Sequence, residues 1–112
     1  MKRMTQFEEI VNPMAYKIVI KEEARLDTEE AYNYYENEKA NLGEEFLEEL
    51  TRIYNRIAKH PDYYGFIDDQ RILRDLKVER FPFTVVFEIT DSSVIVYAVH
   101  NTYRHPKRKL RR

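Results

Sequence analysis

Residues 72–99, ILRDLKVERFPFTVVFEITDSSVIVYAV, decide the fold, because apolar and polar residues alternate along them with the period of a β-strand. The alternation is broken twice by short polar or Pro-containing stretches, and Asp91–Ser93 is a polar hairpin turn. Short connections of this kind predict an antiparallel meander. The three predicted strands are residues 72–78, 83–89 and 94–99.

The segment before this meander has the period of a helix. Residues 43–59 place apolar side chains four, three and four positions apart, which is the stripe of an amphipathic helix that ends before Pro61. Residues 60–70 are predicted to form the loop that leads into the sheet. The apolar stripe consists of Phe46, Leu50, Ile53 and Ile57.

A shorter helix and an opening strand come first. We predict a helix over residues 28–39, because Asp27 and Thr28 offer side-chain oxygens to its first amides. Residues 16–20, YKIVI, are rich in β-branched and aromatic residues and predict a strand. The order β-α-α-β-β-β predicts an α+β fold, in which a two-helix hairpin covers one face of a four-stranded sheet. That sheet is expected to be antiparallel, and mixed at its first strand.

The two ends lie outside this pattern. We interpret residues 1–14 as an N-terminal arm, either disordered or a short helix, residues 15–106 as the domain, and residues 107–112 as a basic tail. The absence of cysteine excludes disulfides and thiolate sites, and the three histidines have no metal-ligand spacing, so no metal or cofactor is predicted. No apolar run of membrane-spanning length or signal peptide is present, which fits a cytoplasmic protein with no membrane partner.

The net charge of −1 is the sum of two unlike parts. Residues 1–70 carry nine Lys or Arg against sixteen Asp or Glu, which gives −7, and residues 71–112 carry ten against four, which gives +6. The acidic excess lies on predicted helix faces, where it is typical of solvated surface. The basic part predicts a face that meets an anionic partner, and six of the residues from Arg104 to Arg112 are Lys or Arg.

Several short motifs in this order resemble the RelE/ParE superfamily of toxins from type II toxin–antitoxin, or plasmid stabilisation, modules. The motifs are the opening strand, Arg74, the Arg80-Phe81-Pro82-Phe83 corner, Phe87-Glu88 and the Arg104-His105-Pro106 tail. The sequence departs from the pattern at Asn101, where these toxins usually have a histidine, and His100 stands one residue early.

The resemblance implies a growth-inhibiting toxin that is neutralised by a cognate antitoxin. A ParE-like member would act on DNA gyrase without being an enzyme, and its target- and partner-binding residues would be Arg74, Arg80, His100, Arg104, Lys107 and Arg108. A RelE-like member would be a metal-independent endoribonuclease that cuts messenger RNA on the ribosome, with Arg74, Arg80, Tyr103 and Arg104 at the cleavage site. A third alternative is an inactive member that only binds its antitoxin. A homodimer and a toxin–antitoxin hetero-oligomer both remain open.

The residue chemistry leaves alternatives at each position. Arginine suits phosphate because its planar fork binds two oxygens, and Arg74 and Arg80 share parity along the predicted strand. Arg74 could instead form a structural ion pair with Glu88, and His100 could be a hydrogen-bonded structural residue. The nine tyrosines are best explained as edges of the core or as a groove for a partner helix. We predict the ParE-like branch, because glutamates dominate the helices that a ribosome-bound nuclease would place against RNA.

Overall fold

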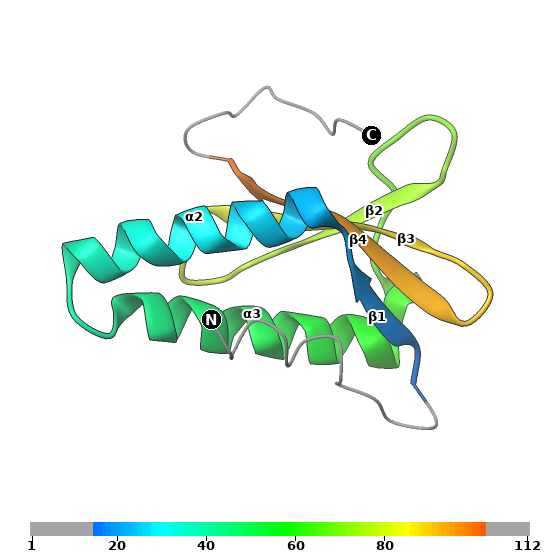
Figure 1. The fold of residues 1–112 in the computed structure, drawn as a ribbon. Coiled ribbons are helices and arrows are strands. Elements are labelled where there is room, and N and C mark those ends of the chain that lie inside the picture. Colours follow the sequence, from blue (N-terminus) through cyan, green and yellow to red (C-terminus); the bar gives the residue numbers. More distant parts are fainter. Residues whose placement is uncertain (1–14, 103–112) are drawn as a thin grey trace.

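A helical hairpin lies against one face of a four-stranded sheet in the computed structural model, which describes residues 15–102 (Figure 1). The predicted α+β class and the order of strands and helices are confirmed. No helix within the described residues is long and apolar enough to cross a lipid bilayer. The proposed arm and basic tail lie outside the described residues. The elements are β1 (Lys17–Ile20), α2 (Glu22–Glu38), α3 (Leu42–Lys59), η2 (Pro61–Tyr63), β2 (Leu73–Lys77), β3 (Phe83–Ile89) and β4 (Ser93–Asn101).

The sheet has the order β1-β4-β3-β2 and is mixed at β1, as predicted. The three strands of the meander pair antiparallel, whereas β1 runs parallel to β4 with Ile18 opposite Val94. The chain passes through both helices, β2 and β3 between β1 and β4, which gives the long connection that a parallel pair of strands requires. The first strand is therefore paired with the last one, and β1 and β2 are the two edges of the sheet.

The core lies between the sheet and α3. This helix buries eight residues, including Phe46, Leu50 and Ile57, and these pack against Phe87 and Val96 of the sheet. In contrast, α2 buries only the small residues Ala24, Thr28 and Ala31. The larger side chains of α2 therefore lie at the edge of the core or in solvent.

The tip of the helical hairpin depends on Glu36 and Gly43. The carboxylate of Glu36 accepts the backbone N–H of Asn41 at 3.0 Å and that of Gly43 at 2.9 Å, so it caps the N-terminus of α3. Asn41 has a φ of 72°, which an asparagine adopts more readily than most residues. A Cβ atom on Gly43 would lie 2.8 Å from the carbonyl oxygen of Tyr32. Glycine at this position therefore permits the close approach of α2 and α3.

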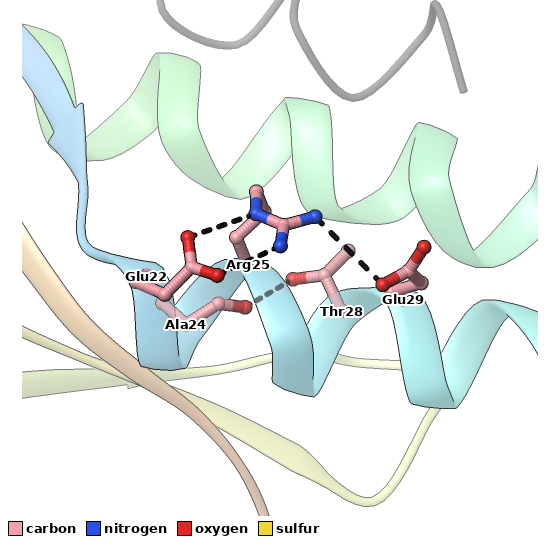
Figure 2. A network of polar contacts seen from close by, with 5 residues as sticks. All are labelled: Glu22, Ala24, Arg25, Thr28 and Glu29. Carbon is pink, nitrogen blue, oxygen red and sulfur yellow. Dashed lines mark hydrogen bonds and ion pairs between the residues drawn. The ribbon is translucent and has the colours of Figure 1, made fainter.

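The start of α2 differs from the prediction. The helix begins at Glu22, so Asp27 and Thr28 lie within it and cap nothing at its N-terminus. Figure 2 shows Arg25 between Glu22 and Glu29, with N–O distances of 2.8 and 3.7 Å, and pairs at this spacing stabilise a helix. Glu22 and Glu23 also complement the positive end of the helix dipole.

Both mispredicted side chains have other partners. The Thr28 hydroxyl donates to the carbonyl of Ala24 at 2.8 Å, one turn earlier in the same helix (Figure 2). The Asp27 carboxylate accepts the backbone N–H of Val99 at 3.0 Å. Asp27 therefore joins α2 to β4 beyond Val96, the last β4 residue that pairs with β1.

A β-bulge interrupts β4 at Tyr97. Phe87 pairs with Val96 and Val86 pairs with Ala98, so β4 advances by two residues where β3 advances by one. After the bulge the parity of β4 changes, and Val99 joins Val96 in the core beneath the helices. Ala98 packs with Tyr97, Val86 and Leu73 on the other face, which we call the helix-free face.

Candidate functional site

Arg74 is an internal anchor of the fold. It pairs with Phe87 across the sheet, which places its side chain on the face covered by the helices. Its Nη1 donates to the carbonyl oxygens of Tyr64 at 2.7 Å and Asp62 at 3.1 Å, and its guanidinium lies 3.9 Å from the centre of the Phe66 ring. The two hydrogen bonds from Nη1 and the stacking on Phe66 hold the segment after α3 against β2.

The expected ion pair between Arg74 and Glu88 is wrong. Glu88 lies opposite Leu73 on the helix-free face and accepts a 2.6 Å hydrogen bond from the Tyr97 hydroxyl. Successive side chains of a strand point to opposite faces, so Arg74 and Glu88 cannot meet in this register.

Arg80 lies beyond the end of β2, in the turn that leads to β3. Its Nη2 is 2.8 Å from Oε1 of Glu45 in the first turn of α3, and its guanidinium lies 5.2 Å from the centre of the Phe81 ring. The hydrogen bond from Arg80 holds the pKa of Glu45 below its ordinary value. The same bond raises the pKa of Arg80, and attraction to Glu45, Glu49 and Glu48 adds to it. Arg80 is thus surrounded by the acidic start of α3.

The structure holds these two arginines apart. Arg80 binds near the N-terminus of α3, and Arg74 binds residues just past its C-terminus. The helix from Glu45 to His60 is about 22 Å long, at 1.5 Å per residue. The sequence predicts that Arg74 and Arg80 share one face of a strand, but β2 ends at Lys77 and Arg80 lies beyond it. The other predicted site residues, Tyr103, Arg104, Lys107 and Arg108, lie outside the described residues.

His100 lies near the end of β4 opposite Thr84, which in turn lies opposite Lys77 on β2. Thr84 and His100 each stand two residues from a member of the apolar cluster on the helix-free face, so this row lies on that face. Thr84 is buried and His100 is half-buried. Two residues after His100, the amide and the hydroxyl of Thr102 both donate to the carbonyl of Pro82, at 2.9 and 3.2 Å. These bonds connect the end of β4 to the Arg80–Phe83 corner.

The helix-free face carries polar residues that are not among the predicted site residues. Asp75 and Lys77 point to it from β2, and the hydrogen-bonded pair Glu88 and Tyr97 lies between β3 and β4. The available signal was parity, because Asp75 and Lys77 alternate with Arg74 and Leu76 along one strand. Between residues 15 and 102, no group of three His, Cys, Asp or Glu side chains could hold a metal ion.

Comparison with known proteins places the fold. Neither a family model nor a curated protein matches this sequence. A chain from the solved structure "Chromosomal ParDE TA system from P. aeruginosa" is similar in structure, with a TM-score of 0.68 and 14% sequence identity over 80% of this chain and 98% of that chain. The fold that the sequence resemblance implies is therefore confirmed.

Proposed function

We propose that this chain is the toxin of a type II toxin–antitoxin pair, of the ParE-like kind that stops growth by acting on DNA gyrase in the cytoplasm. A cognate antitoxin neutralises it. The observation that carries the proposal is the likeness to a chain of a ParDE toxin–antitoxin system, which extends over 98% of that chain. The motifs from Arg74 to Glu88 support the same family independently of the fold.

The contacts of the two described arginines favour the ParE-like branch over a nuclease. Cleavage of RNA without a metal requires cations that converge on one phosphate, since the charge that develops there must be stabilised. Arg74 is committed to backbone carbonyls and Arg80 to Glu45, on opposite ends of α3. Glutamates also dominate α2 and α3, and their charge disfavours contact between these helices and a nucleic acid.

A RelE-like endoribonuclease is the second candidate, and the helix-free face supports it. His100 and the Glu88–Tyr97 pair are groups that can transfer protons, and Lys77 could attract a phosphate. This arrangement uses residues of β2, β3 and β4, and the RelE-like alternative also needs Tyr103 and Arg104, which lie outside the described residues. The same face would serve equally for binding alone, which is the third alternative of an inactive antitoxin-binding protein.

The test is to induce the chain alone in a bacterium and follow growth, DNA supercoiling and protein synthesis in the same culture. We expect growth arrest with a loss of supercoiling, relieved when the antitoxin is co-expressed. Early loss of protein synthesis with cut messages would transfer the assignment to the RelE-like branch. Normal growth would leave only antitoxin binding.

A matched pair of variants tests the proposed target-binding role of Arg80. Arg80→Gln should lower toxicity, whereas Arg52→Gln should not. Arg52 is the appropriate control because it is also exposed and paired with a glutamate of α3, Glu49, at 3.0 Å. Equal effects of the two substitutions would remove Arg80 from the proposed surface.

A further inference from the structure

The loop between η2 and β2 extends away from both helices and the sheet (Figure 1), yet it is held in one conformation by its own contacts. The Asp68 carboxylate accepts the backbone N–H groups of Ile72 and Leu73 at 2.9 and 3.0 Å. The Ile67 amide donates to Leu73 O at 2.8 Å, and the Arg71 amide donates to Asp68 O at 3.1 Å. A projecting loop with this many internal hydrogen bonds loses little conformational entropy when it binds a partner.

Arg71 stands at the turn of this loop with a φ of 59°, a conformation that is costly for an arginine. The hydrogen bonds around Asp68 offset this cost, and they fix the backbone position from which the Arg71 side chain extends. Non-glycine residues in the left-handed backbone conformation are concentrated at functional sites.

An aromatic series leads from the core to the outside of the loop. The Tyr64 ring meets Phe87 of the core edge-on at 6.3 Å, and Tyr63 meets Tyr64 edge-on at 5.2 Å. Tyr63 stands at the outer end of the series and is 80% exposed, more than any other large hydrophobic side chain described. Phe66 lies under the anchored guanidinium of Arg74, which also binds the carbonyls of Asp62 and Tyr64 on either side of Tyr63.

Arg71 is the arginine that remains available to a partner. Of the six arginines within residues 15–102, five form an ion pair with a carboxylate or a hydrogen bond to a carbonyl of this chain, namely Arg25, Arg52, Arg56, Arg74 and Arg80. The contact found for the Arg71 side chain is stacking on Phe66, at 5.1 Å from the ring centre. Stacking leaves the N–H groups of a guanidinium free to bind an oxygen from outside.

We propose that Tyr63, Phe66 and Arg71, here called the aromatic–arginine knob, insert into an apolar pocket beside a carboxylate on the folded protein that this toxin acts on. The proposal rests on the proposed function for the existence of that target. Tyrosine and arginine are the residues that most often dominate binding energy in protein interfaces. A projecting, rigid knob fits a pocket on a folded protein, whereas a peptide that wraps around the chain needs a groove or a strand edge.

Charge argues against a nucleic acid as the occupant of this surface. Asp62 and Asp69 are exposed on the same segment as Arg71, so the loop has no excess of positive charge. Binding to phosphate backbones depends on several cations together and weakens steeply with salt.

The experiment compares the full-length chain with Tyr63→Ala and Arg71→Gln, using Tyr34→Ala as the control. Tyr34 is 56% exposed on α2, away from the loop, so its truncation matches the loss of an exposed ring. We expect each knob variant to bind purified DNA gyrase roughly tenfold to thirtyfold more weakly, as loss of an interface hot spot does, and to lose toxicity in cells. Its thermal midpoint and its affinity for the antitoxin should equal those of the unmodified chain.

Three results would overturn the inference about the knob. These are toxicity equal to that of the unmodified chain, a weaker affinity for the antitoxin at unchanged gyrase binding, and a loss confined to salt-sensitive RNA binding. If the unmodified chain itself arrests no growth, the proposed function fails first and the inference fails with it. Full toxicity of both the unmodified chain and its variants would remove the knob alone.

Discussion

Replacing Asp27 with alanine removes the carboxylate that accepts the Val99 amide of β4 at 3.0 Å. Val99 is 1% exposed, so water cannot take over as the acceptor without a local opening of the structure. The strand neighbour on that side, β1, pairs only as far as Val96. The substitution should therefore leave a buried N–H group with no acceptor between α2 and β4.

The expected loss is about 2 kcal/mol in the free energy of unfolding, since a hydrogen bond to a charged group is worth roughly 1.5–3 kcal/mol. At about 2.1 cal/mol/K per residue, the unfolding entropy of a chain of this length converts that loss into a fall of about 8 °C in Tm. Asp27→Asn keeps an oxygen acceptor without the charge and should lose about half as much. Thermal unfolding followed by circular dichroism measures both values.

Asn33→Ala is the control, because Asn33 is an exposed residue of α2 and its truncation should change stability by less than about 0.5 kcal/mol. Hydrogen exchange adds a local measure, since the Val99 amide should be protected in the unmodified chain and exchange faster in Asp27→Ala. A Tm for Asp27→Ala equal to that of the control, with Val99 still protected, would refute the assigned role of Asp27.

Three further predictions concern the interior. Gly43→Ala should destabilise the chain by about 1–3 kcal/mol, because the Cβ of alanine would lie 2.8 Å from the Tyr32 carbonyl oxygen. An unchanged midpoint of urea denaturation would contradict this prediction. Burial, and to a lesser degree the charge of Asp27, raises the pKa of Tyr54, whereas an unfolded tyrosine titrates near 10. The unfolded chain thus releases this proton first, so stability should fall as pH rises above about 10, and a Tyr54→Phe variant with an equally steep alkaline fall would refute the linkage. Arg74→Lys should lose about 1–2 kcal/mol and expose the loop before β2 to proteolysis, because lysine lacks the planar group that stacks on Phe66 while Nη1 binds the two carbonyls. Unchanged cleavage rates would argue against Arg74 as an anchor.

The sequence was sufficient for the element order because the apolar periods are strong. The stripe of α3 and the alternation in β3 each follow one regular pattern, and short polar turns separate the strands. The resemblance carried by Arg74 and the Arg80–Phe83 corner led to the same fold as the comparison with solved structures.

The errors concern polar side chains whose partners are selected by the folded structure and not by residue type. Asp27 and Thr28 have the residue types of a helix cap, but Asp27 binds β4 and Thr28 bonds back within α2. The ion pair with Glu88 is an alternative for Arg74 because both residues are charged and lie on predicted neighbouring strands. The register of β2 against β3 sets their faces, and local patterns do not contain that register.

The site was predictable only in part for the same reason. Parity along β2 could be read from the sequence, and it correctly separates Arg74 from Lys77. The partner of Arg80 could not, since Glu45 is one of several glutamates at the start of α3 and only the packed turn selects it. The bulge at Tyr97, which turns Val99 toward the core, also leaves no local mark in the sequence.

The pairing of β1 with β4 has a consequence for synthesis. A nascent chain that has emerged as far as β3 holds both helices and most of its apolar residues, but β1 still has no strand beside it. The closing contact joins segments from opposite ends of the described chain, and such non-local pairing is slow compared with helix formation. A chain whose synthesis stops before Ser93 would therefore lack β4, and β1 would have no strand to pair with. The complete sheet forms only after β4 has been synthesised.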